Sequence, residues 1–546
     1  MAASLRLWGI DYGLPCTYSR PDEDRLITTA LRLSLSDLNP HYFIWPGFFF
    51  YLSRVVLEVA TRGYSLISPG FSGSSRDLYM ADPAYFHLVL RYIFCGFGLA
   101  TVYLLYRLGR ELFSSSVGLL SAFFLGLSFL HARDSHFAML DIPATLLAVG
   151  FFLPIVYIVR RGRWRDYLWA GFLLGLATAT KYYAVLLVIP LVTAHLSRTG
   201  PPRGTTVRRL TVALILATSV FILGSPYTLL DTPSFIREVK TEIFTSQFIE
   251  GFLLVSGLKT PRGWLYHIIF SFRYGLGWPL EIVSLLGVGY AAFRAVRGKI
   301  PARLILSFVI PFYLVLSFQK SCFIRYTTLL LPFLCVLSAS LLVRIIPRNR
   351  YRGLFLTVAG LVLVLEPSIR IIQLDRLLAR TDTRLPAGEW MRDHISPESG
   401  VIFPQAMIFG RPDGFFFYPN RVSLPAGSGP GTLSILLSAP APKEKYIVIS
   451  EHPLSYSRLA PEVKSLLENA SEEVYSIKGG GEGRQNVVYD PFDAFYLPLA
   501  GFAGVDSPGP KIRVFYMDSG CSPEAGRATY LNRGDAESAE KNIKVY

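Results

Sequence analysis

Charged residues are scarce in this chain of 546 residues. They make up 17% of it, whereas hydrophobic residues make up 51%, and the mean hydropathy is +0.38. A soluble globular domain carries roughly 25% charged residues. This chain therefore has too few charged residues to cover the surface of a soluble protein of its length. A helix needs about 20 apolar residues to cross a bilayer, whose lipid offers backbone amides no hydrogen-bonding partner. The long apolar runs therefore predict a helical membrane protein.

Cysteine and acidic residues are also few. The cysteines are Cys16, Cys95, Cys322, Cys335 and Cys521. They show no metal-ligand spacing, so neither a disulfide framework nor a zinc site is predicted. Asp and Glu number 39 against 54 Lys and Arg, a net charge of +15. Nucleic-acid-binding proteins gather such an excess on one motif face, but here the basic residues lie between apolar runs, and no nucleic-acid partner is predicted.

Ten apolar segments predict spanning helices, at residues 84–106, 117–131, 137–159, 167–180, 182–197, 210–229, 276–293, 304–318, 325–343 and 353–372. Lys and Arg gather in alternate loops between them, and loops of this kind stay in the cytoplasm. The opposite, extracytoplasmic side receives residues 61–83, 132–136, 230–275, 319–324 and everything after 373. The chain is therefore predicted to cross the inner cell membrane several times, with its acidic loops outside.

Residues 41–59 are apolar, but counting them as a span would break this alternation. Their Pro46, Gly47 and crowded aromatic residues suit a helix lying in the headgroup plane. Residues 1–380 are thus predicted to form a transmembrane domain whose first extracytoplasmic loop, at 11–83, includes that interfacial helix.

Residues 381–546 predict a small extracytoplasmic α/β domain that ends in a polar tail. Strand-like runs lie at 445–450, 473–477 and 512–517. The predicted fold is therefore a polytopic α-helical membrane protein of about 10–11 spanning helices with a small C-terminal α/β domain.

Two groups of acidic residues lie on the predicted outer side. Asp22, Glu23 and Asp24 precede the interfacial segment, where unpaired carboxylates near a bilayer are costly unless hydrated, paired or functional. Alternatively, Asp22 caps a helix. Arg133 and His136 lie in a short turn before Asp141, which begins a span. This cluster suits a polar site at the membrane surface, or else a capping Asp and a locally neutralised Arg.

Three cations also fall near the outer side. Lys181 lies between two short apolar segments, where it either extends to the interface or faces a lipid phosphate. Lys320 and Arg325, followed by Tyr326, occupy a tight turn on the side that otherwise lacks basic residues. They either bind an anion or anchor the interface together with Tyr326.

Together these motifs resemble glycosyltransferase family 39, which includes protein O-mannosyltransferases and aminoarabinose transferases of the type C fold. The motifs, in order, are Gly9–Pro15, Pro21–Glu23, Arg133–Asp141, Thr180–Tyr182, Lys320–Tyr326 with Pro332, and Asp382–Trp390. The similarity extends over about residues 1 to 400. Members usually carry a spanning helix before the acidic loop, and we expect this chain to begin at the last residues of such a helix, LRLWGI.

The resemblance implies a membrane glycosyltransferase that takes its sugar from a polyprenyl-phosphate carrier and inverts the anomeric centre on the outer face. Asp22 and Glu23 match the family's acidic pair, with Asp22 as the general base, and Asp141 is the second acidic position. Lys320 and Arg325 would bind the donor phosphate, with Lys181 as a weaker candidate. The remaining predicted positions, which would contact the acceptor or support the loop, are Arg133, His136 and Tyr326.

The partners predicted are a polyprenyl-phosphate-linked sugar, membrane lipids, and a protein, lipid or glycan acceptor. No cofactor is required, although the His and carboxylate residues permit a divalent metal. The main alternative is a transporter or flippase of lipid-linked sugars. Transporters tend to show internal repeats and charges within broken helices at the midplane. No repeat is visible here, and the polar groups gather on one side, which favours the transferase.

Overall fold

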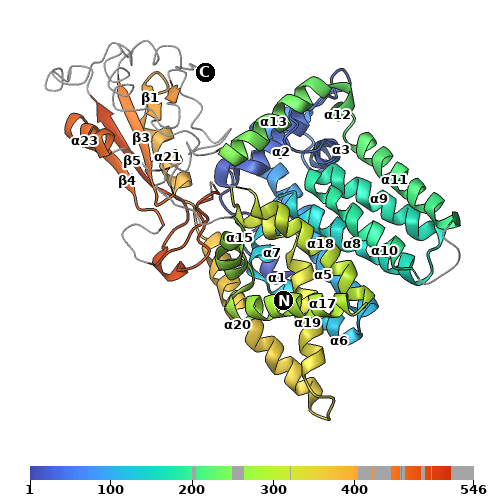
Figure 1. The fold of residues 1–546 in the computed structure, drawn as a ribbon. Helices are drawn as coiled ribbons and strands as arrows, with labels where there is room; N and C mark the ends of the chain where they lie inside the picture. The colour runs from blue at the N-terminus through green and yellow to red at the C-terminus, as the bar shows by residue number, and fades with distance from the viewer. Residues whose placement is uncertain are drawn as a thin grey trace.

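The computed structural model describes residues 1–198, 204–248, 263–319, 321–403, 421–423, 444–454, 457, 461–480, 486–493 and 495–517. Its larger part is a bundle of helices, and its smaller part is a sheet flanked by helices (Figure 1). The predicted fold class, a helical membrane protein with a small C-terminal α/β domain, is confirmed.

The bundle contains helices on the predicted apolar segments and shorter helices in the stretches between them. They are α1 Ser4–Leu7, α2 Pro21–Arg32, α3 Phe48–Ile67, α4 Ser75–Ala81, α5 Pro83–Leu112, α6 Ser115–Gly126, α7 Phe129–Asp134, α8 Asp141–Arg160, α9 Trp164–Thr180, α10 Val188–Leu196, α11 Gly204–Gly224, α12 Tyr227–Leu230, α13 Thr232–Phe248, α15 Gly263–Tyr266, α16 Arg273–Leu276, α17 Trp278–Val296, α18 Ile300–Ser317, α19 Leu331–Ile345 and α20 Arg352–Leu378. Tighter or wider turns are η1 Thr17–Ser19, η2 Tyr182–Leu187, η3 His267–Phe272 and η4 Ile324–Thr327. Each of the ten predicted segments overlaps one of these helices.

Fewer helices are long enough to span a membrane than the 10–11 predicted. Within the described residues, length and composition qualify six: α5, α8, α11, α17, α18 and α20. The 12 residues of α6 rise about 18 Å at 1.5 Å per residue, less than the ~30 Å hydrocarbon core. Helices α9 and α19 stop short because the turns η2 and η4 interrupt the helical path. Such irregular backbone is tolerated at membrane depth where protein surrounds it.

The segment predicted to lie at the membrane interface, 41–59, supplies a loop and the first half of α3. Although α3 has 20 residues, it is not among the six candidate spans. Its buried face joins that of α2 and α5 in one apolar cluster that includes Leu26, Phe50 and Phe86. Its placement in the headgroup plane stays a prediction.

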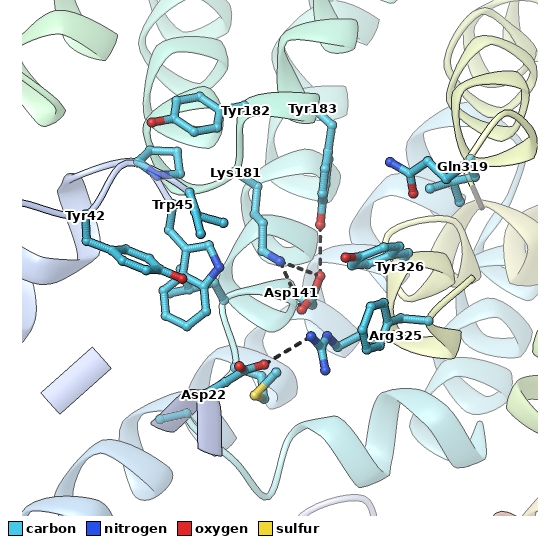
Figure 2. A pocket seen from close by; sticks show the side chains of 17 residues that line it. Asp22, Tyr42, Trp45, Asp141, Lys181, Tyr182, Tyr183, Gln319, Arg325 and Tyr326 are labelled. Atoms are coloured by element: carbon cyan, nitrogen blue, oxygen red, sulfur yellow. Dashed lines mark hydrogen bonds and ion pairs between the residues drawn. The ribbon is translucent and has the colours of Figure 1, made fainter. Parts of the chain in front are cut away.

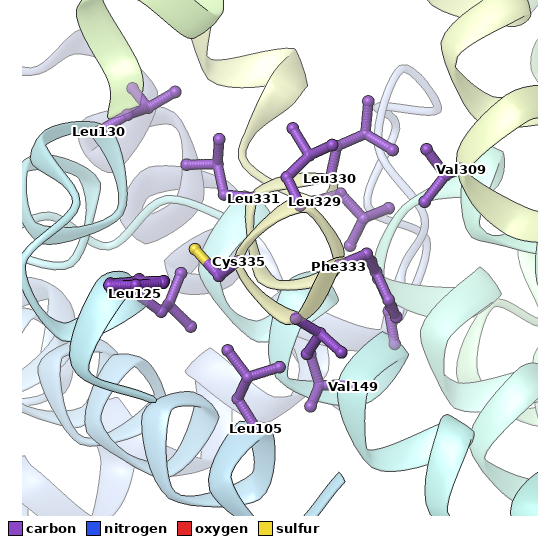
Figure 3. Packing of buried hydrophobic residues seen from close by; sticks show 14 of the residues in the cluster. Leu105, Leu125, Leu130, Val149, Val309, Leu329, Leu330, Leu331, Phe333 and Cys335 are labelled. Carbon is purple, nitrogen blue, oxygen red and sulfur yellow. The ribbon is translucent and has the colours of Figure 1, made fainter. Parts of the chain in front are cut away.

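Helix α19 lies in the middle of the bundle. All residues from Leu331 to Ala339 are buried, and side chains of the surrounding helices, such as Leu105, Val149 and Val309, face it (Figure 3). A helix that is apolar on every side is typical of a core position. Because η4 ends only a few residues before α19 begins, this packing fixes the turn that carries Arg325.

Helices α9 and α11 approach each other closely through glycine. A Cβ atom on Gly171 would lie 2.3 Å from the carbonyl oxygen of Ala213, and one on Gly175 would lie 2.4 Å from that of Ala217. Small residues at this four-residue spacing let membrane helices pack backbone to backbone. The contact holds α9 in place, and α9 ends one residue before Lys181.

The C-terminal domain contains a five-stranded mixed sheet in the order β2-β1-β3-β5-β4. Its elements are α21 Arg384–His394, β1 Gly400–Phe403, β2 Arg421–Ser423, β3 Lys445–Glu451, α23 Pro461–Ala470, β4 Glu472–Ile477, η7 Phe502–Gly504 and β5 Lys511–Met517. The three predicted strand-like runs coincide with β3, β4 and β5. The predicted polar tail from Ser519 onward lies outside the described residues.

Between β4 and β5 the chain leaves the sheet and packs against the bundle. We call residues 486–493 and 495–505 the docking segment. Its apolar side chains Phe495, Leu497, Leu499 and Phe502 belong to the same buried cluster as the bundle helices. A domain division at residue 380 therefore separates residues that share one core. No periodicity in the sequence signals such a contact, because it depends on residues far apart in the chain.

Candidate functional site

A cavity of about 310 Å³ opens among the loops that join the bundle helices. Side chains from stretches far apart in the sequence point into it (Figure 2). The lining residues are Asp22, Tyr42, Ile44, Trp45, Pro46, Ala138, Met139, Leu140, Asp141, Lys181, Tyr182, Tyr183, Leu316, Gln319, Phe323, Arg325 and Tyr326. Five of the predicted site residues are thus brought together: Asp22, Asp141, Lys181, Arg325 and Tyr326.

Asp22 presents an open carboxylate to this cavity. It lies in the first turn of α2, and one carboxylate oxygen is 3.2 Å from Nη2 of Arg325, while 30% of its side chain is exposed. The alternative that Asp22 caps a helix does not hold, because the residue at the cap position is Arg20 and the helix start has no side-chain cap. The carboxylate is therefore paired with Arg325 and partly exposed to the cavity.

Asp141 and Lys181 form a second charged pair in the cavity wall. Asp141 is buried at the start of α8, and its Oδ1 lies 3.1 Å from Nζ of Lys181. The same oxygen accepts a hydrogen bond of 2.8 Å from the hydroxyl of Tyr183. Lys181 therefore faces the cavity, where Asp141 and the end of α9 hold it (Figure 2).

Arg325 is the central cation of the site. Its Nη1 donates to Asp493 of the docking segment at 2.9 Å, and its guanidinium lies 4.3 Å from the centre of the Phe323 ring. Burial disfavours the charged form, but the carboxylates of Asp22 and Asp493 outweigh it and hold the pKa of Arg325 above its usual value. Lys320, the other predicted phosphate ligand, lies outside the described residues.

Glu23 does not reach the cavity, contrary to its predicted catalytic role. Its side chain is fully buried and pairs with Nη2 of Arg91 on α5 at 2.6 Å. It also accepts the backbone N–H of Ala138 at 2.7 Å. Successive helix residues point about 100° apart, since α-helices have 3.6 residues per turn, so Glu23 faces α5 while Asp22 faces the cavity. We assign Glu23 a structural role in fixing α2.

Replacement of Glu23 tests this structural role. Glu23→Gln should lower the free energy of unfolding by about 3–5 kcal/mol, because it leaves the buried Arg91 charge without its partner. Thermal unfolding of the protein in detergent measures the change. Glu58→Gln, which removes a partly exposed partner of Arg54 on α3, is the matched control and should have a small effect. Equal losses in the two variants would contradict the assignment.

Arg133 and His136 also lie away from the cavity. Arg133 pairs with Asp134 at 2.8 Å, and Asp134 in turn accepts from the hydroxyl of Thr328 at 3.1 Å. His136 is buried, 3.4 Å from a carboxylate oxygen of Asp375. In these positions the two side chains do not line the cavity, so contact with an acceptor there, one of their two predicted roles, is not supported. Both side chains instead connect the turn before α8 to neighbouring elements.

Several residues at the site were not predicted. Tyr42 and Trp45 form one wall of the cavity (Figure 2), and their signal was the aromatic crowding that was interpreted only as an interfacial helix. Arg20 and Asp493 form an ion pair of 2.8 Å behind Arg325. Asp493 has no local signal beyond a second acidic residue, Asp490, three positions earlier.

Within the part of the chain that the structure describes, no group of three His, Cys, Asp or Glu residues is arranged to hold a metal ion. The two cavity carboxylates, Asp22 and Asp141, are each paired with a cation. The possibility of a divalent metal stays a prediction.

The sequence and the fold of the chain are similar to those of known proteins. Residues 87–229 match the family model described as dolichyl-phosphate-mannose-protein mannosyltransferase. The fold is similar to that of ArnT from Cupriavidus metallidurans bound to undecaprenyl phosphate, with a TM-score of 0.51, 13% identity, and coverage of 94% of this chain and 96% of that one. The chain thus has the type C glycosyltransferase fold, and its residues 87–229 are similar to the mannosyltransferase family. The predicted resemblance to that family is confirmed.

Two other solved structures also match the chain. The Archaeoglobus fulgidus oligosaccharyltransferase in complex with Zn and sulfate has a TM-score of 0.48 at 14% identity, covering 75% of this chain and 60% of that one. The chain thus spans about 60% of the length of that protein. The arabinofuranosyltransferase AftD from Mycobacteria has a TM-score of 0.44 at 15% identity, covering 95% and 41%. No curated protein sequence matches the chain.

Proposed function

We propose that this protein transfers a sugar from a polyprenyl-phosphate carrier to an acceptor hydroxyl, on the extracytoplasmic face of the inner membrane and with inversion. One observation carries the proposal: the open carboxylate of Asp22 and the two cations Lys181 and Arg325 face the same cavity. A glycosyl transfer of this kind needs both functions, because a proton must leave the acceptor while negative charge grows on the phosphate.

The donor class is supported by chemistry and by similarity. Lys181 and Arg325 supply donors to a phosphate, and the apolar side chains of Trp45, Leu316 and Phe323 in the cavity wall suit a hydrocarbon chain. The family whose model matches residues 87–229 is described by dolichyl-phosphate-mannose. The ArnT structure with the similar fold holds undecaprenyl phosphate.

These positions support the following reaction. The acceptor oxygen attacks the anomeric carbon as the bond from that carbon to the phosphate oxygen breaks, so the configuration inverts. Asp22 accepts the hydroxyl proton as general base, and the polyprenyl phosphate leaves with the electron pair of the broken bond. Arg325 and Lys181 stabilise the charge that develops on the phosphate, where a cavity shielded from water strengthens the interaction. Asp141 orients Lys181.

The acceptor is a protein, a lipid or a glycan, since nothing in the cavity selects among them. The positive loops of the sequence support an outer position for the cavity and the C-terminal domain. The alternative, a transporter or flippase of lipid-linked sugars, would move the same donor without breaking the bond to the phosphate.

Purified protein in lipid vesicles distinguishes the two functions. Supplied with radiolabelled polyprenyl-phosphate sugars and a cell-envelope extract as acceptor, the wild type should release free polyprenyl phosphate and label a product with inverted configuration at the anomeric carbon. The release of polyprenyl phosphate is measured directly by chromatography. Movement of intact donor across the vesicle membrane, with no release of polyprenyl phosphate, would contradict the transferase and favour the transporter.

A further inference from the structure

The docking segment delivers a carboxylate to the cation that faces the cavity. One oxygen of Asp493 accepts from Nη1 of Arg325 at 2.9 Å, and the other accepts from Nη1 of Arg20 at 2.8 Å. The Asp493 side chain is only 5% exposed and does not line the cavity. A single carboxylate thus holds two guanidinium groups side by side, and of these two only Arg325 lines the cavity.

The same segment also grips the backbone of the turn that carries Arg325. Asp490 accepts the N–H of Ile324, the residue before Arg325, at 3.1 Å. The ring of Phe492 lies 6.0 Å from that of Phe323 and 5.6 Å from that of Tyr266. The docking segment therefore contacts both the backbone and the side chain of η4.

The charges at this contact depend on one another. Burial opposes ionisation of Asp493, but Arg20 and Arg325 outweigh it and hold the pKa of Asp493 well below its usual range. Without that carboxylate, the guanidinium groups of Arg20 and Arg325 would repel each other across a buried space. Arg325 would then move toward its remaining anionic partner, Asp22, which is 3.2 Å away.

We propose that Asp493 is a positioning residue for the transfer reaction: it fixes Arg325 so that Nη1 points away from the cavity while Nη2 serves Asp22 and the donor phosphate. The inference rests on the proposed function. It makes the C-terminal domain part of the catalytic geometry, because Asp493 comes from the chain between β4 and β5. Displacing a catalytic group by about 1 Å costs about 10²-fold in rate, so the effect should fall on kcat.

The test compares three variants of the full-length protein in vesicles, with polyprenyl-phosphate sugar as the donor. Asp493→Asn removes the charge and keeps the size, and it should lower kcat about 10- to 100-fold with the donor KM changed less than about threefold. Asp493→Glu restores the carboxylate and should recover part of kcat. Glu473→Gln removes another arginine-paired carboxylate of the same domain, at the surface of β4 beside Arg513, and should behave like the wild type.

The test separates an effect on the transfer reaction from an effect on folding. We divide kcat by the folded fraction, which is measured by size-exclusion chromatography and thermal unfolding. If Asp493→Asn only folds poorly, its normalised kcat equals that of the wild type, and the inference is overturned. Asp493→Asn with the normalised kcat of Glu473→Gln overturns it equally, while the proposed function stands. A wild type that releases no polyprenyl phosphate overturns the proposed function itself and this inference with it.

Discussion

Asp22→Asn should lower kcat about 10³-fold, within the 10²–10⁴ range that a general base contributes. The amide cannot accept the acceptor proton, but its oxygen still accepts from Nη2 of Arg325, which lies 3.2 Å from the native carboxylate. The donor KM should therefore change little. Transfer from polyprenyl-phosphate sugar under single-turnover conditions measures the chemical step alone.

The matched control for this variant is Asp37→Asn. Asp37 lies in the exposed loop after α2 and pairs with His41 at 2.9 Å, so the substitution removes a nearby carboxylate that does not line the cavity. It should leave kcat unchanged. Transfer at wild-type rates in Asp22→Asn would remove Asp22 as the base and leave Asp141 as the remaining carboxylate in the cavity.

Arg325→Met should lower kcat about 10²- to 10³-fold, the cost of losing one donor aimed at developing negative charge. It should also weaken the binding of undecaprenyl phosphate. Arg325→Lys should recover only part of this loss, because an ammonium keeps the charge but lacks the planar fork that serves Asp22 and Asp493 at once. Rates of transfer and binding of the lipid phosphate, measured on the same preparations, report the two effects.

Arg54→Met provides the comparison for Arg325. Arg54 lies on α3, partly exposed, and pairs with Glu58 at 3.3 Å. It carries the same charge but does not line the cavity. If Arg325→Met binds undecaprenyl phosphate as well as Arg54→Met does, the phosphate does not bind at Arg325 and the donor site lies elsewhere.

The sequence predicted the helical regions and much of the cavity because both depend on local signals. Apolar runs mark helices in a membrane protein, and a charged residue among them is costly enough to indicate a role. Asp141, Lys181 and Arg325 each stood out in this way, and the structure brings all three to one cavity. Helix length was harder to predict, since α9 and α19 are shortened by η2, which begins directly after Lys181, and by η4, which carries Arg325.

Other parts of the site depend on contacts that no local pattern records. Asp22 and Glu23 are neighbours in the sequence and both acidic, yet one faces the cavity and the other pairs with Arg91. Which neighbour faces inward depends on where α5 packs. The contact between Arg325 and Asp493 spans 168 residues, and it joins segments that the sequence assigned to different domains.

A structure of the protein with undecaprenyl phosphate bound would show directly where the donor phosphate binds. We expect the phosphate to contact Arg325 and Lys181, with Asp22 facing the position of the departing sugar. A second recess, between α17 and α20, is lined by Glu366 and Arg370 among apolar side chains. Lipid phosphate bound there, with the cavity at Asp22 left to other ligands, would contradict the account.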